Sequence, residues 1–86
     1  MKGPRLAPHV RLAYDKSRGR QVLLAPESVT TLNDTGAAIA RLCDGDHPVE
    51  AIVAELRERY SGVRAEDVES FLGKLSDLRC LKKGGS

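Results

Sequence analysis

The sequence predicts a small α+β domain in which three short strands precede three helices. Two patterns predict this order. Apolar and polar residues alternate over residues 9–15, as in a strand with one buried face, whereas apolar residues recur every three or four positions over residues 49–60, as on one helix face. Between them, residues 26–45 change from an extended to a helical pattern. Strands and helices that are segregated along the chain in this way are typical of α+β domains.

Composition limits the kind of protein that this chain can form. Its 86 residues suffice for one core, which must be aliphatic because the chain has no Trp, one Phe and two Tyr. A net charge of +2 is too small to indicate a nucleic-acid partner by itself. No apolar run reaches the ~18 residues of a membrane span, and the N-terminus lacks the apolar run of a signal peptide. We therefore expect a cytoplasmic protein with no membrane partner and with two reduced cysteines.

The chain divides into one domain and two short ends. Residues 1–8 contain a glycine and two prolines and show no periodicity, so we expect a mobile N-terminal arm. Residues 9–82 carry all the periodic segments and are expected to form the single domain. Residues 83–86 are expected to be a disordered tail.

The three strands are expected at residues 9–15, 21–25 and 29–32. A polar loop that contains Gly19 separates the first two, and a turn at Pro26 separates the second from the third. Connections this short join antiparallel neighbours, so the sequence predicts a three-stranded meander.

The helices follow from caps and apolar stripes. Asn33 is a good N-cap for the first helix, and Gly45 can adopt the left-handed conformation that ends it. Pro48 suits the start of the second helix. The third helix is expected over residues 65–79. Its apolar stripe consists of Val68, Phe71, Leu72, Leu75 and Leu78. Short helices with short turns beside a small sheet resemble a winged helix-turn-helix.

The sequence indicates no catalytic, metal or cofactor site. The four metal-binding side chains other than carboxylates are His9, Cys43, His47 and Cys80, and they form no pair with the spacing of a zinc site. Cys43 falls on the apolar stripe of the first helix, which favours a core thiol. The chain also lacks a nucleophile motif and a phosphate-binding glycine loop. We therefore expect a protein that is not an enzyme and has no cofactor.

A winged-helix DNA-binding protein is the alternative that the expected fold suggests. In such a protein the N-terminal turn of the third helix would approach DNA, but here it carries Glu66, Asp67 and Glu69, which phosphates would repel. The basic residues of the loop at 16–20 could form a positively charged wing. A solvated turn explains these basic residues better, so we expect no nucleic-acid partner.

A peptide-binding module fits the expected sheet better. The third strand ends the meander, so one of its edges is open to an incoming strand. The third helix could supply side chains beside that edge. The candidates are Phe71, Lys74, Leu75 and Leu78, and the periodicity explains the apolar ones equally well as core residues.

Four segments give the chain a resemblance to the PqqD family. They read VLLAPE at 22–27, LNDT at 32–35, LCDG at 42–45 and EDVESFLGKL at 66–75. The resemblance covers residues 9–82. The chain departs from the family at 21–22, where an aromatic residue is absent, and at 78–81, where a glycine often precedes the final apolar residue.

The resemblance implies a function. Proteins of this family bind the precursor peptide PqqA and present it to the radical SAM enzyme PqqE during biosynthesis of pyrroloquinoline quinone, and they are not enzymes. They are similar to the recognition domains of other peptide-modifying pathways, in which the peptide adds to the third strand and lies against the third helix. Carried onto this chain, the peptide-binding residues are Val29, Thr30, Thr31, Leu32, Asp67, Ser70, Phe71, Lys74 and Leu75. A homodimer formed by arm exchange near Pro26 stays open as an alternative to a monomer.

Overall fold

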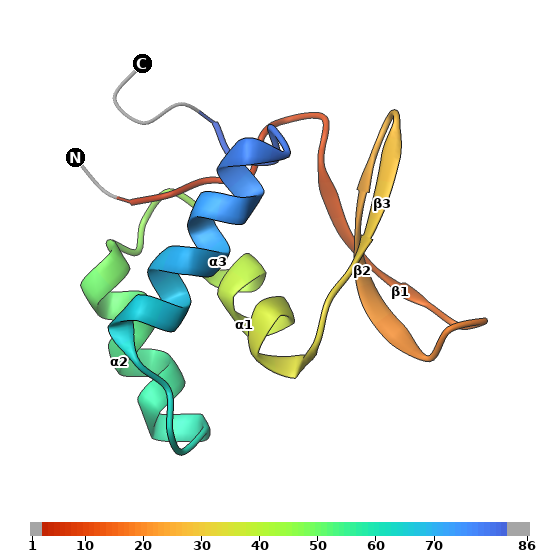
Figure 1. Cartoon of the computed structure of the whole chain (residues 1–86). Helices are drawn as coiled ribbons and strands as arrows, with labels where there is room; N and C mark the ends of the chain where they lie inside the picture. Colours follow the sequence, from red (N-terminus) through yellow and green to blue (C-terminus); the bar gives the residue numbers. More distant parts are fainter. Residues whose placement is uncertain (1–2, 83–86) are drawn as a thin grey trace.

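A computed structural model of the chain describes residues 3–82. Three strands come first: β1 (Arg11–Asp15), β2 (Arg20–Ala25) and β3 (Ser28–Thr31). Three helices follow: α1 (Asp34–Leu42), α2 (Val49–Arg59) and α3 (Ala65–Asp77). The antiparallel sheet has the order β1-β2-β3 and stands beside the helices, with α1 between the sheet and α2 (Figure 1). The predicted three-stranded sheet followed by three helices is therefore confirmed.

Local signals in the sequence explain where α1 begins and how the hairpins turn. Asn33 caps α1, and its Oδ1 accepts a hydrogen bond from the Gly36 amide at 2.7 Å. Gly19 closes the β1–β2 turn with a positive φ of 65°, as expected for a residue without a Cβ. Two residues join β2 to β3, because Ala25 pairs with Ser28 across the Pro26–Glu27 turn.

The third helix is shorter than the sequence predicts. It ends at Asp77 instead of Arg79, because Arg79 adopts a left-handed φ of 61°. The amide of Arg79 donates to the Ser76 carbonyl at 2.9 Å, and the amide of Cys80 donates to the Leu75 carbonyl at 2.8 Å. This pair of bonds is a Schellman motif, which glycine usually closes. Here Arg79 adopts the left-handed conformation, within the segment 78–81 in which the sequence departs from the family.

Two hydrophobic clusters hold the elements together. The sheet cluster joins the sheet to α1 and α3 and consists of Ala7, Val10, Leu23, Leu32, Ala37, Ala40, Leu75 and Cys80. The helical cluster lies among the three helices and consists of Ala38, Ile39, Cys43, Ile52, Val53, Leu56, Val68 and Leu72. Phe71, Leu6 and Leu81 are partly buried against both clusters. The core is aliphatic, as the composition predicts.

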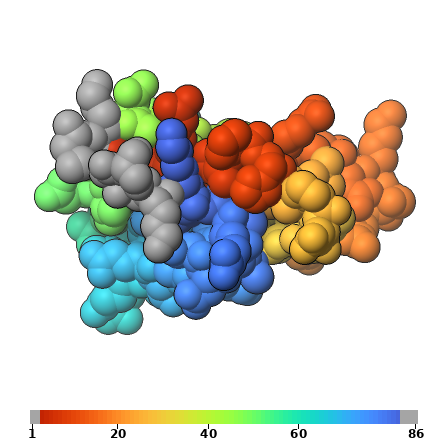
Figure 2. Space-filling view, turned by 90° about the horizontal axis from the view of Figure 1, so that it is seen from above, coloured from red at the N-terminus to blue at the C-terminus, as the bar shows by residue number. Residues whose placement is uncertain are grey.

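The N-terminal segment is attached to the helices along its described length. The Leu6 amide donates to the Cys43 carbonyl at 3.0 Å, and the Ala7 amide donates to the Cys80 carbonyl at 2.8 Å. Leu6 also forms a β-bridge with Leu81. Figure 2 shows the same segment, in red, beside the blue end of α3. This differs from the mobile arm expected for residues 1–8, of which 1 and 2 lie outside the described residues, as does the expected tail at 83–86.

Candidate functional site

The outer edge of β3 is open. Among the described residues β3 pairs only with β2, and the strand order places it at one side of the sheet. Beyond its last residue, the Leu32 amide donates to the Gln21 carbonyl at 2.9 Å. Because inward and outward backbone groups alternate along an antiparallel strand, the amides and carbonyls of Ser28 and Thr30 also face β2. Those of Val29 and Thr31 face outward and are available to an added strand.

The four predicted strand residues divide into three surface residues and one core residue. Val29 and Thr31 are exposed and lie on one face of β3, whereas Thr30 is half-buried on the opposite face, across from Leu23. Leu32 is 3% exposed and belongs to the sheet cluster. The structure therefore offers backbone groups and three side chains at this edge, with Leu32 as their anchor in the core.

The five predicted residues of α3 also divide by burial. Asp67, Ser70 and Lys74 are exposed and Phe71 is half-buried. Leu75 has 0% exposure and contacts the sheet cluster, so its side chain is a core residue in this structure. Helical spacing alone could not distinguish the exposed residues from the buried Leu75, because surface and core residues lie on adjoining faces of α3.

A hollow of about 370 Å³ lies where α1 meets the start of α3. We call it the α1–α3 hollow. Its lining includes Thr35, Gly36, Ile39, Val63, Asp67, Val68 and Phe71. Ile39 and Val68 are buried, so its floor is apolar. Asn33 also lines it and comes one residue after Leu32. The hollow therefore begins near the point where the chain leaves β3, and it includes the predicted residues Asp67 and Phe71.

Gly36 allows this hollow to exist in its present form. A Cβ at Gly36 would lie 3.2 Å from Cε1 and Cζ of the Phe71 ring and 3.0 Å from Asn33 Oδ1. A larger residue would therefore push the ring that forms one wall. Apolar periodicity does not point to Gly36, although an isolated glycine inside a helical pattern often has a packing reason.

Burial and local hydrogen bonds explain the shifted pKa values of the titratable groups. Burial raises the pKa of the Cys43 thiol to about 12 and also raises the pKa of Cys80. The Ser17 hydroxyl donates to Asp15 at 2.7 Å and lowers the pKa of that carboxyl. His47 Nδ1 lies 2.9 Å from Asp44 Oδ1, a contact that raises the pKa of His47 and lowers that of Asp44. These groups stabilise turns and the core.

Residues 3–82 contain neither a cluster of metal-binding side chains nor a helix fit to span a membrane. In that part of the chain no group of three or more His, Cys, Asp or Glu side chains is arranged to hold a metal ion. No helix within it combines the length and apolarity needed to cross a membrane.

Comparisons with known proteins identify the family. Residues 20–81 match the family model for PqqD, coenzyme PQQ synthesis protein D. A PqqA binding protein of Rhodopseudomonas palustris strain BisB5 is 42% identical over 75 residues, which cover 87% of this chain and 74% of the relative. A PqqA binding protein of Pseudomonas fluorescens is 41% identical over 73 residues, which cover 83% and 80% of the two chains.

A solved structure has the same fold. It is the solution NMR structure of the PqqD truncation of Methylobacterium extorquens PqqCD, described as a functional and stand-alone recognition element for ribosomally synthesized and post-translationally modified peptides. The two structures agree with a TM-score of 0.73 and 34% identity over 93% of this chain and 88% of the other. The predicted resemblance is thereby confirmed, and this chain belongs to the PqqD family.

Proposed function

We propose that this protein is a non-catalytic peptide chaperone that binds the precursor peptide PqqA as a fourth strand on β3 and presents it to the radical SAM enzyme PqqE. Family membership supports the choice of peptide, because similar proteins are named PqqA binding proteins. The observation that carries the proposal is the open edge of β3, where the backbone groups of Val29 and Thr31 face outward. Asn33, two residues beyond Thr31, lines the α1–α3 hollow.

The energetics require both the edge and the hollow. The outward groups of Val29 and Thr31 allow at most four backbone hydrogen bonds, each of which stabilises the complex by about 0.5–1.5 kcal/mol net. Ordering each peptide residue costs about 1–2 kcal/mol, so these bonds alone barely offset the ordering of a short segment. Burial of one large aliphatic side chain contributes a further ~1.5–3 kcal/mol. The α1–α3 hollow can receive such a side chain, with Phe71 as one wall and Asp67 at the rim.

The remaining predicted residues keep distinct places in this proposal. Ser70 and Lys74 are exposed on α3, where they would contact polar parts of the peptide. Leu32 and Leu75 are buried in the sheet cluster, where their packing would fix the distance between β3 and α3. Fixing the peptide in one register raises its effective concentration at PqqE once that enzyme binds.

The test is a titration of unlabelled PqqA into ¹⁵N-labelled protein, followed by amide chemical shifts. We expect saturable shifts at Val29, Thr31, Asp67 and Phe71. Thr31→Pro removes an outward amide and should weaken binding by roughly three- to tenfold, the loss of about one net hydrogen bond, while the sheet persists. Thr31→Ala is the matched control, since it shortens the side chain but keeps the amide, and it should bind normally.

Two outcomes would reject the strand-addition model. One is a Thr31→Pro variant that binds PqqA as tightly as Thr31→Ala does. The other is a set of saturable shifts that leaves β3 unaffected. A proline at Thr30 would not serve, because the Thr30 amide faces β2 and its loss would weaken the hairpin itself.

A further inference from the structure

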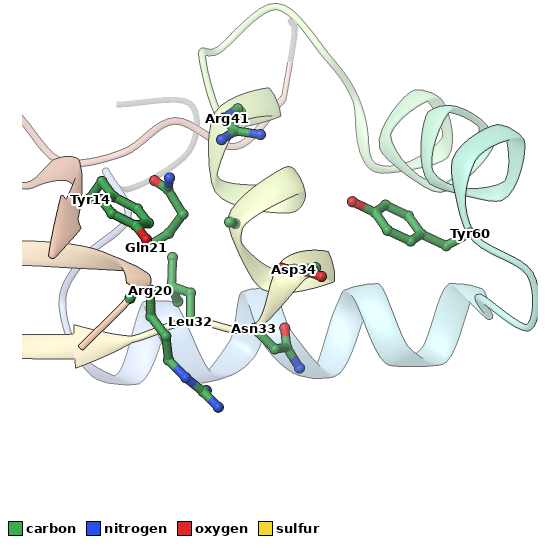
Figure 3. A pocket seen from close by; sticks show the side chains of 10 residues that line it. Tyr14, Arg20, Gln21, Leu32, Asn33, Asp34, Arg41 and Tyr60 are labelled. Carbon is green, nitrogen blue, oxygen red and sulfur yellow. The ribbon is translucent and has the colours of Figure 1, made fainter. Parts of the chain in front are cut away.

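A second concave surface crosses α1, with a volume of about 430 Å³. We call it the tyrosine trough. Its lining includes Tyr14, Gln21, Ala37, Arg41 and Tyr60. Figure 3 shows Tyr14 and Gln21 on the sheet side of α1 and Tyr60 on the α2 side, with its hydroxyl directed toward α1. Ala37 lies in the helix between these two walls, and its small side chain leaves the trough open.

The tyrosine trough and the α1–α3 hollow lie on opposite faces of α1. Asp34, Ala37 and Arg41 line the trough, whereas Thr35, Gly36 and Ile39 line the hollow. Successive residues of an α-helix turn by ~100°, so these two sets point about half a turn apart. Asn33, the N-cap of α1, lines both cavities. Beyond that residue, the thickness of α1 separates a molecule in the trough from one in the hollow.

The charge of the trough favours an anionic occupant. Arg20 and Arg41 line it, and neither makes an ion pair with any residue from 3 to 82. Its only acidic lining residue is Asp34. Lys16 and Arg18 lie in the adjacent β1–β2 turn, and Arg18 is held by Asp15 at 3.5 Å. Two arginines and one aspartate thus leave the lining of the trough with a net positive charge beside two tyrosine rings.

We propose that the tyrosine trough is a docking surface for an acidic segment of a partner polypeptide. Arginine binds carboxylates through two parallel hydrogen bonds, and Arg41 forms no ion pair with a carboxylate of residues 3–82 that would compete with a ligand. Tyrosines supply apolar contact area together with a hydroxyl, which is why they are frequent at the centres of interfaces. The inference stands apart from peptide binding at β3, although it would let the protein hold its peptide and a partner at once.

The test uses the full chain, ¹⁵N-labelled, and a capped hexapeptide of alternating Glu and Tyr as the probe. We expect saturable shifts at Gln21, Ala37, Arg41 and Tyr60, which weaken as salt is added. Arg41→Glu should lower the affinity by roughly five- to tenfold, because it replaces an attraction by a repulsion. Arg41→Gln should lower it less, since it removes only the attraction.

Arg11→Glu is the matched control, because it makes the same charge change at an exposed residue outside the trough. It should leave the affinity within about twofold of the unmodified protein, because an exposed charge that does not line the trough is screened from the bound peptide by water and salt. Equal losses in Arg11→Glu and Arg41→Glu would overturn the proposal by showing non-specific attraction. Equal binding of a hexapeptide with Lys in place of Glu would overturn it as well.

A competition separates this proposal from the proposed function. The acidic hexapeptide is added to protein that already carries saturating PqqA. Unchanged shifts in the trough support a separate site, and displacement by PqqA overturns it. Failure of PqqA to bind anywhere would reject the proposed function and leave the result for the hexapeptide intact.

Discussion

The helical cluster and the sheet cluster are enclosed to different degrees. Helices α1, α2 and α3 surround the helical cluster, and no large hydrophobic side chain of α1 or α2 is exposed. Among residues 3–82, the large hydrophobic side chains that are exposed belong to the sheet and to the C-cap of α3. They are Tyr14, Leu24, Val29 and Leu78. The helical half, formed by the three helices around the helical cluster, therefore has an enclosed core. The sheet half is a single layer of strands, and its outer face and the edge of β3 are exposed.

Under the proposed function, this difference would separate the parts of the molecule that give stability from those that bind the peptide. An open strand edge is a hazard for aggregation, and proteins keep one when it has a partner to bind. The sheet half carries the edge of β3, while the helical half supplies the rigid support behind it. Leu75 connects the two halves, because it comes from α3 but packs in the sheet cluster.

The largest expected effect compares Ile52→Ala with Leu75→Ala. Both residues have 0% exposure, so each substitution should lower the free energy of unfolding by about 2–5 kcal/mol through lost burial and a new cavity. Only Leu75→Ala should also weaken PqqA binding by the folded protein, because it loosens the contact between α3 and the sheet. Urea denaturation and calorimetric titration at low temperature measure the two quantities.

Ser70→Ala provides the control on the same helix as Leu75. Ser70 is exposed, so its stability should change by less than ~0.5 kcal/mol. If Ile52→Ala weakened PqqA binding as strongly as Leu75→Ala, the two halves would not have separate roles.

An intermediate effect is expected from Gly36→Ala, in the lining of the α1–α3 hollow. Alanine favours a helix by about 1 kcal/mol over glycine, but the new Cβ would press on the Phe71 ring, so the net stability should change little. Displacement of that ring should reshape the α1–α3 hollow and lower the affinity for PqqA by roughly three- to tenfold, about the effect of losing part of one buried side chain. Calorimetric titration measures this loss.

Gly73→Ala is the matched control, because a Cβ at Gly73 meets nothing within 4 Å. It should raise the free energy of unfolding by about 0.5–1 kcal/mol and leave the affinity unchanged. Equal affinities for the Gly36 and Gly73 variants would exclude the hollow from the peptide site.

The smallest expected effect concerns the turn that carries the chain from α3 back to the sheet cluster. Arg79→Gly should stabilise the protein by about 0.5 kcal/mol. Glycine removes the strain of a side chain at a left-handed φ in the folded protein, and this gain slightly exceeds the loss from the greater entropy of glycine in the unfolded chain. Arg79→Ala keeps the strain and should give no increase. Thermal unfolding of the two variants distinguishes them, and a stabilised alanine variant would contradict the role assigned to backbone strain.

The sequence predicted the fold because its signals were local. Alternation marked the strands, the Asn33 cap marked the start of α1, and stripes of apolar residues marked the helices. The attachment of Leu6 and Ala7 was not predictable in this way, since their partners Cys43, Cys80 and Leu81 are distant in the chain.

The candidate site was predicted less completely than the fold. The open edge of β3 followed from strand order, but which of its amides face outward required the register with β2. Periodicity placed Phe71 and Leu75 on one stripe and could not show that only Phe71 reaches the surface. The tyrosine trough brings together Tyr14 and Tyr60 from separate elements, so no local pattern could indicate it.

The bridge between Leu6 and Leu81 bears on how the protein is made. The Lys82 amide donates to the Arg5 carbonyl at 2.7 Å beside this bridge, so the last described residues close a loop around nearly the entire domain. Contacts between such distant positions form late, because the chain must lose the entropy of loop closure before these contacts can stabilise the fold. During synthesis on the ribosome, hairpins and helices can form as they emerge. The fold closes only after residues 80–82 have left the ribosome, and until then Leu6 and Ala7 lack their partners Leu81 and Cys80.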